Sequence, residues 1–198
     1  MDFLALLPDL VKMIVAMFIV VNPLGSVPIF VGLTKDMDKS QRKKTYQLAT
    51  ITGLILLAFF SLVGQNVLVL FGISWGSFMI AGGILLLIVA IRLLIIGGWS
   101  EHQIASESVG AVPIGCPLLV GPGAITTSIL NIQSFGIFAT LLSVFLTFVI
   151  VWLILRFIDP IYRVLGKNGS LVITRVMALL IAAISVQYIL DGIKSGLL

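Results

Sequence analysis

Charged side chains are scarce in this sequence of 198 residues, of which Lys, Arg, Asp and Glu together make up 10%. A soluble globular domain contains about 25% charged residues. Hydrophobic residues make up 60% of the chain, and a water-soluble fold of this size could not bury that much apolar surface. The composition therefore excludes an ordinary soluble domain and favours a polytopic membrane protein.

Metal-ligating and nucleophilic residues are also few, with one cysteine, Cys116, and one histidine, His102. A single cysteine can form neither an internal disulfide nor a thiolate cluster. His102 stands with Glu101 and Glu107 in a polar stretch, without a spacing typical of a zinc site. We therefore expect no enzyme activity, no catalytic residues, no metal centre and no cofactor. The role of Glu101, His102 and Glu107 is left open.

Six apolar runs approach the ~20 residues that a helix needs to cross the hydrocarbon core of a bilayer. They lie at 10–33, 48–70, 78–96, 112–132, 137–155 and 171–190. The short connections leave no room for a soluble domain. Residues 1–198 are thus predicted to form one all-α membrane domain with six transmembrane helices. The first run lacks an obvious signal-peptide cleavage site, so we expect it to remain as the first span.

Basic residues gather after the first run and between the last two runs. The two groups are Lys35, Lys39, Arg42, Lys43 and Lys44, and Arg156, Arg163, Lys167 and Arg175. Short loops rich in Lys and Arg stay in the cytoplasm. Four predicted spans separate the two groups, so both groups can lie in the cytoplasm, with both termini outside it. No basic face interleaved with aromatic residues exists, and no nucleic-acid partner is expected.

Each half of the chain opens with an apolar run interrupted by proline and glycine. The first contains NPLGSVPIF at 22–30, and the second contains PLLVGPGAIT at 117–126. Three spans per half is an odd number, so residues 1–98 and 99–198 would form two inverted three-helix repeats, each with a broken first helix. Paired breaks of this kind indicate the substrate site of a secondary transporter.

The breaks also indicate what such a site could hold. Pro23 lacks an N–H and Gly25 allows unusual backbone angles, and Gly121, Pro122 and Gly123 combine both properties. Free N–H groups of a restarted helix favour a carboxylate, and free carbonyls before the break favour an ammonium group or Na+. No Asp, Glu, Lys or His lies near the middle of a run. The pattern therefore fits a zwitterion near the membrane midplane.

The predicted substrate-binding residues lie in the breaks or just after them. They are Asn22, Pro23, Gly25, Ser26, Gly121, Pro122, Gly123, Thr126 and Thr127, with Ser128 and Asn131 as further polar candidates. Packing remains an alternative for each polar side chain, because Ser and Thr can bond to carbonyls of their own helix and Asn can join helices. Arg92 is expected to reach the lipid headgroups, and Asp191 to lie near water.

Three motifs occur in order along the chain: NPLGSVPIF at 22–30, AGGILLLIVAIRLL at 81–94 and PLLVGPGAIT at 117–126. With them the chain resembles the MarC family of bacterial inner-membrane proteins over nearly its whole length. Members described as SnatA transport small neutral amino acids such as glycine and alanine, coupled to a cation gradient. The resemblance implies that the residues matching the family's break motifs line the substrate site. They are Asn22, Pro23, Gly25, Ser26, Gly121, Pro122, Gly123 and Thr126. Met79 departs from the pattern, where Arg is expected.

The sequence and the resemblance together predict a symporter of small neutral amino acids that works by alternating access in the bacterial inner membrane. The coupling ion is expected to be Na+ or H+. No carboxylate lies near the middle of a span to carry H+, which favours Na+ held by carbonyls and hydroxyls near the breaks, and the choice between the two ions is left open. Export of other small polar metabolites or drugs, and a non-transporting accessory role, remain alternatives. Direction, stoichiometry, exact substrate and assembly as a homo-oligomer are left open.

Overall fold

The computed structural model describes residues 3–34, 36–96 and 119–197, and all regular structure in these ranges is α-helical. The helices are α1 (Phe3–Val21), α2 (Pro23–Leu33), α3 (Lys39–Leu70), α4 (Trp75–Ile96), α7 (Pro122–Phe135), α8 (Ile137–Arg156) and α9 (Ile158–Leu197). The all-α prediction is therefore confirmed.

Five segments of the described chain are long and apolar enough to cross a membrane. They are Leu7–Leu33, Lys39–Leu70, Trp75–Ile95, Ile137–Arg156 and Ile158–Ser195. The remaining predicted run, 112–132, begins outside the described residues, and its described part, α7, has 14 residues, which is shorter than a bilayer-crossing helix of about 20. The chain is thus a multi-pass membrane protein, and the sixth span stays a prediction.

The basic segment after the first span is more helical than the sequence analysis predicted. Helix α3 begins at Lys39 because Asp38 forms a capping box with Gln41. The Asp38 carboxylate accepts hydrogen bonds from the backbone N–H groups of Ser40 and Gln41 at 2.7 and 2.9 Å, and the Gln41 side chain accepts one from the Asp38 N–H at 3.1 Å. Four of the five basic residues of this segment therefore belong to the helix and not to a loop.

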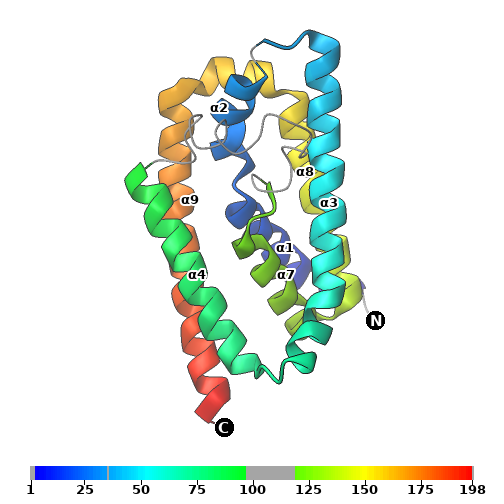
Figure 1. Cartoon of the computed structure of the whole chain (residues 1–198), viewed down its shortest axis with the longest axis vertical. Helices are drawn as coiled ribbons and strands as arrows, with labels where there is room; N and C mark the ends of the chain where they lie inside the picture. The colour runs from blue at the N-terminus through cyan, green and yellow to red at the C-terminus, as the bar shows by residue number, and fades with distance from the viewer. Residues whose placement is uncertain (1–2, 35, 97–118, 198) are drawn as a thin grey trace.

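The predicted loop between the last two spans is also helical. Residues 158–165 form a short helix that lies across the end of the molecule before α9 turns along the bundle (Figure 1). The turn occurs at Gly166, where φ is 59° and ψ is −171°. Glycine adopts a positive φ at little cost because it has no Cβ, so a single residue redirects the chain here.

The helices pack in a pattern that places the two breaks in the interior. Helix α4 packs along α9 and α3 along α8, while α1, α2 and α7 lie between these pairs (Figure 1). Helices α2 and α4 run toward the end of the molecule that carries the start of α3, and α3 runs away from it. In the second half α7 and α9 run away from this end and α8 runs toward it (Figure 1).

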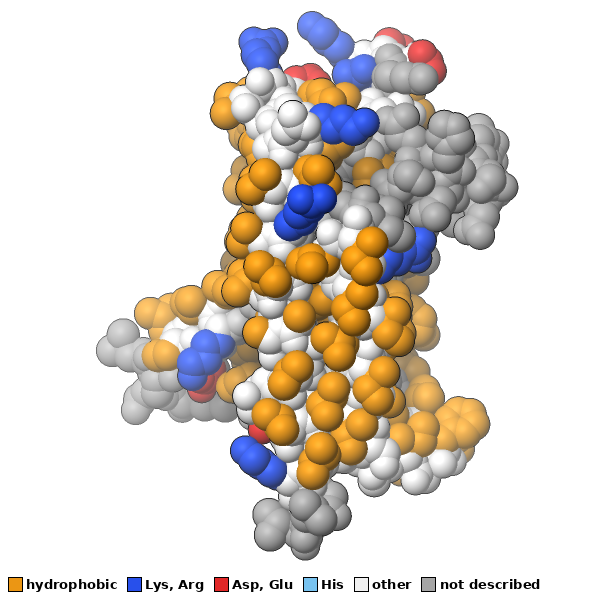
Figure 2. Space-filling model, turned by 90° about the vertical axis from the view of Figure 1, so that its left-hand side faces the viewer, with side chains coloured by type: hydrophobic (Ala, Val, Ile, Leu, Met, Phe, Trp, Pro, Cys, Tyr) orange, Lys and Arg blue, Asp and Glu red, His pale blue; other side chains and the backbone are white. Residues whose placement is uncertain are grey.

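The surface is suited to lipid over much of its height. Figure 2 shows hydrophobic side chains over the middle and lower parts of the face formed by α4 and α9, whereas most Lys and Arg side chains lie in its upper half. Large apolar residues such as Ile55, Val172 and Leu179 are each 61% exposed. In a bilayer such side chains contact acyl chains instead of water.

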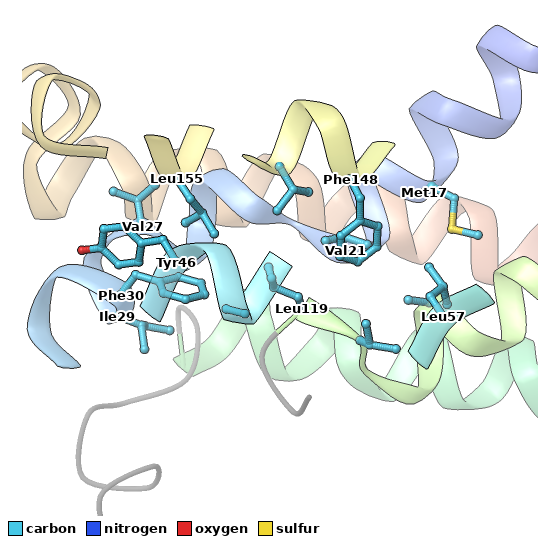
Figure 3. Packing of buried hydrophobic residues seen from close by; sticks show 14 of the residues in the cluster. Met17, Val21, Val27, Ile29, Phe30, Tyr46, Leu57, Leu119, Phe148 and Leu155 are labelled. Atoms are coloured by element: carbon cyan, nitrogen blue, oxygen red, sulfur yellow. The ribbon is translucent and has the colours of Figure 1, made fainter. Parts of the chain in front are cut away.

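A buried hydrophobic cluster holds the first break in place. Met17 of α1 and Phe30 of α2 belong to it together with Leu57 of α3 and Phe148 of α8 (Figure 3). The ring of Phe30 meets that of Tyr46 edge to face, with centroids 5.9 Å apart. The Tyr46 hydroxyl also hydrogen-bonds Thr34 Oγ1 at 2.7 Å. Helix α2 is thereby fixed against α3.

Candidate functional site

The first break is made by one residue, Asn22, between α1 and α2. It is the non-glycine residue with a positive φ among the described residues, with φ 48° and ψ 53°. Its Oδ1 accepts a hydrogen bond from the Gly25 N–H at 3.3 Å, and its carbonyl accepts bonds from the Ser26 N–H and hydroxyl, each at 3.2 Å. Asn22 thus caps α2, and it uses N–H groups that the sequence analysis expected to face a ligand.

One backbone carbonyl near the end of α1 has no N–H group four residues later from which to accept a hydrogen bond. The Asn22 N–H donates to the Phe18 carbonyl at 3.0 Å, which completes the α1 pattern up to this residue. The next acceptor, the Ile19 carbonyl, would receive its bond from residue 23, but Pro23 has no N–H. The Ile19 carbonyl therefore lacks the partner that a continuous helix would give it.

Glycine is required at position 25 because α2 approaches α9 closely there. A Cβ on Gly25 would collide with Thr174 Oγ1 of α9 and would lie 2.5 Å from Asn22 Nδ2. Thr174 is 1% exposed, and its hydroxyl donates to the Ser170 carbonyl at 2.9 Å. Thr174 was not among the predicted site residues, although Ser170 and Thr174 stand four residues apart in an apolar stretch and so share one face of the helix.

The second predicted break lies at the start of α7, and its capping differs from that of α2. A helix before it would lie outside the described residues, so the interruption itself stays a prediction. Gly121 is extended, with φ −76° and ψ 169°, and its carbonyl accepts from the N–H groups of Ala124 and Ile125 at 3.0 and 3.2 Å. No side chain caps this end, so the Gly123 N–H lacks an acceptor of the kind that Asn22 supplies in the first break. The positive end of a helix dipole with an uncapped N–H favours an anionic group.

Both breaks line the same cavity, which has a volume of about 60 Å³. Its lining comes from α1, α2, α4, α7, α9 and the residues just before α7, namely Val20, Val21, Asn22, Gly25, Ser26, Ile29, Val89, Leu93, Leu119, Gly121, Pro122, Gly123, Ala124 and Thr174. A water needs at least about 10–15 Å³ of such space, so the cavity holds a few waters or one very small solute. None of these lining residues is charged.

Six of the nine predicted substrate-binding residues line this cavity: Asn22, Gly25, Ser26, Gly121, Pro122 and Gly123. The structure places the other three elsewhere. Pro23 is buried in the first turn of α2. Thr126 and Thr127 lie deeper in α7, where the Thr126 methyl group occupies the space that a side chain at Gly82 of α4 would need.

A second group of buried polar atoms lies further along α7. Thr127 Oγ1 and Asn131 Nδ2 are buried, and neither has a hydrogen-bond partner within the described chain. Tyr188 of α9 lies beside Thr127. Ser128, by contrast, donates to the Ile125 carbonyl at 2.8 Å, as the packing alternative predicted. An unpaired buried polar atom is costly, so Thr127 and Asn131 are candidates for contact with a moving solute.

The predictions about acidic residues and metal binding concern residues both inside and outside the described part of the chain. Glu101, His102, Glu107 and Cys116 lie outside the described residues. Across 3–34, 36–96 and 119–197, no three His, Cys, Asp or Glu side chains come together as a metal site, and the expected absence of a metal centre stays a prediction. Asp191 accepts a hydrogen bond from Gln187 Nε2 at 2.8 Å near the exposed end of α9.

The sequence of the chain matches a known protein family over nearly its whole length. A family model described as "MarC family integral membrane protein" matches residues 7–197. The chain belongs to the MarC family. This confirms the resemblance found in the motifs around both breaks.

Three relatives align with this MarC family chain along nearly their full length. The chain is 34% identical over 200 residues to "UPF0056 membrane protein YhcE" of Escherichia coli (strain K12), which covers 94% of this chain and 93% of the relative. It is 35% identical over 193 residues to a "UPF0056 membrane protein" of Archaeoglobus fulgidus, covering 91% and 90%. One from Buchnera aphidicola subsp. Schizaphis graminum is 34% identical over 194 residues, covering 93% and 92%. No solved structure matches significantly.

Proposed function

We propose that this MarC family protein is a secondary transporter of small neutral amino acids of the glycine and alanine class. The substrate binds in the cavity that the two helix breaks share. The observation that carries the proposal is this shared lining: a break from each half of the chain contributes to one small cavity whose lining has no charged side chain. Such a site suits a solute that is itself small and has no net charge.

The two breaks offer different groups to the two ends of a zwitterion. The uncapped start of α7, with the Gly123 N–H, favours the carboxylate. The Ile19 carbonyl and the side chain of Asn22 at the first break favour the ammonium group. Ile29, Val89 and Leu93 form an apolar part of the lining, which leaves little room beyond a methyl group.

Alternating access would use the two halves, 1–98 and 99–198, as inverted repeats that rock around the site. The opposite run directions of α2, α3 and α4 and of α7, α8 and α9 support this (Figure 1). So do the contacts of each half's restarted helix with the other half, α2 with α9 and α7 with α4. The basic end then faces the cytoplasm of a bacterial inner membrane, with both termini on the other side.

Coupling to Na+ is part of the proposal. A bare cation needs oxygen ligands, and the hydroxyls of Ser26 and Thr174, which both line the cavity, would supply them together with a carbonyl at the end of α1. No carboxylate lines the cavity to carry a proton. The protein acts without an organic cofactor and without catalytic residues, since its substrate is moved and not converted.

Uptake and counterflow of labelled glycine in proteoliposomes test the proposal. We expect saturable uptake driven by a Na+ gradient, competition by alanine, and little competition by leucine. Thr50→Val serves as a control, because Thr50 is buried in α3 and bonded to the Tyr46 carbonyl but does not line the cavity. Transport of other small polar metabolites or drugs in place of amino acids would favour the exporter alternative. A lack of transport for all of them, at several ion gradients, would leave an accessory role.

A further inference from the structure

A second and larger cavity lies at the basic end of the molecule and shares no lining residue with the cavity of the two breaks. It has a volume of about 280 Å³ and is formed by the start of α3, the end of α8 and the start of α9. Its lining residues are Lys39, Arg42, Lys43, Tyr46, Gln47, Trp152, Leu155, Arg156, Ile158 and Asp159. We call this cavity the basic cleft.

The basic cleft has an excess of positive charge. Four of its lining residues are Lys or Arg and one is Asp, which gives a formal charge of 4 − 1 = +3. Arg42 is held in position from two sides: its Nη1 lies 3.6 Å from Asp159 Oδ1, and its Nε donates to the Thr34 carbonyl at 2.9 Å. A preorganised guanidinium with further cations around it matches the geometry and charge of a phosphate group.

One wall of the basic cleft is apolar. Leu155, Ile158 and the ring of Tyr46 are buried there, and Trp152 is 40% exposed. Trp152 lies one helical turn before Arg156 on α8, so an indole and a guanidinium share one face of the helix. Trp is typical of the interface between lipid headgroups and acyl chains. The cleft thus combines a cationic side with a wall that can contact the glycerol and upper acyl region of a lipid.

We propose that the basic cleft binds the phosphate-bearing headgroup of an anionic phospholipid from the cytoplasmic leaflet. The shared chemistry is that of a phosphate, which a soluble phosphate compound also carries, but the apolar wall with Trp152 favours the lipid. Because the cleft joins α3 of the first half to α8 and α9 of the second, the bound headgroup holds these helices together. The inference is independent of the transport function.

The basic residues outside the cleft provide a matched control. Lys44, Arg163 and Lys167 are basic residues of the same two segments, but they do not line the cleft. General attraction to an anionic membrane would use all of them alike. Binding at a specific site would instead depend on the cleft residues Lys39, Lys43 and Arg156. These three residues carry the same total charge as the three outside the cleft, so substituting either set removes the same charge.

Lipid binding to the purified full chain tests the proposal by native mass spectrometry with phosphatidylglycerol, phosphatidylcholine and inorganic phosphate as probes. We expect the protein to prefer phosphatidylglycerol. The triple variant Lys39→Gln/Lys43→Gln/Arg156→Gln should bind it roughly 100-fold more weakly, because each Lys or Arg near an anionic lipid contributes about a factor of five. The control variant Lys44→Gln/Arg163→Gln/Lys167→Gln should keep the preference.

Quenching of Trp152 fluorescence provides a second readout that does not depend on charge substitutions. In a Trp75→Phe/Trp99→Phe protein, brominated phosphatidylglycerol should quench Trp152 more strongly than brominated phosphatidylcholine. Equal quenching by both lipids would overturn the proposal, as would equal loss of binding in the two triple variants. Displacement of phosphatidylglycerol by millimolar inorganic phosphate would also overturn it, in favour of a soluble anion.

Discussion

Replacing Asn22 separates its structural role from its proposed role in binding. Asn22→Ala removes the side-chain cap on the Gly25 N–H, which costs about 1 kcal/mol. It also forces Ala into the left-handed region that Asn22 occupies, at a cost of roughly 1–2 kcal/mol. Asn22→Gly avoids the second cost and reduces the first to a few tenths of a kcal/mol. The free energy of unfolding should therefore fall by about 2–3 kcal/mol for Ala and by less than about 1 kcal/mol for Gly.

Transport should respond differently to the same two substitutions. Both remove the amide group from the cavity lining, and loss of a hydrogen bond to a charged group costs about 1.5–3 kcal/mol. We therefore expect kcat/KM for glycine to fall at least tenfold in Asn22→Gly as well as in Asn22→Ala. Unfolding in mixed micelles and uptake into proteoliposomes measure the two effects. Wild-type transport by Asn22→Gly, or equal stability of the two variants, would refute the reasoning.

Three further substitutions probe the surroundings of the cavity. Thr174→Val keeps the shape of a buried lining residue but removes its hydroxyl, so glycine uptake should fall several-fold, while Thr50→Val should not change it. Gly25→Ala places a Cβ against Thr174 and Asn22, and it should abolish binding of labelled glycine. Gly64→Ala crowds Ile129 of α7 instead. It should lower only the free energy of unfolding, by about 1–3 kcal/mol. Tyr46→Phe should lower the free energy of unfolding by about 1 kcal/mol, because it leaves Thr34 without this hydrogen-bond partner, with uptake unchanged. Loss of uptake in Thr50→Val, retained binding in Gly25→Ala, or reduced uptake in Tyr46→Phe would each contradict these expectations.

The class of protein and the position of the breaks were predictable because their signals are local. A long apolar run indicates a membrane span by itself, Asn22-Pro23 disfavours a continuous helix, and Gly121-Pro122 suits a helix start, as seen at α7. The capping box at Asp38 and Gln41 is equally local. Hydropathy alone does not detect it, so the predicted run began at 48 whereas α3 begins at Lys39. Gly166 similarly marks the turn into α9.

The composition of the cavity was only partly predictable because it depends on contacts between distant segments. Nothing in the sequence around Thr174 indicates that α9 meets α2 at Gly25. The use of Asn22 as a cap was readable in principle, since Asn favours both the left-handed region and the N-cap position. The neighbours of Thr126 and Thr127 depend on where α4 and α9 pack against α7. The spacing of polar residues within α7 does not specify this packing.

Protection of cysteines in the two breaks tests most directly the claim that both halves line one substrate cavity. In a Cys116→Ser protein, Ser26→Cys reports on the first break and Ala124→Cys on the second, since both residues line the cavity. The rate of alkylation of each thiol by a small reagent is measured with and without glycine. The account predicts that glycine protects both positions with the same half-maximal concentration and that leucine protects neither. Protection of only one position, or of neither at concentrations that saturate transport, would contradict it.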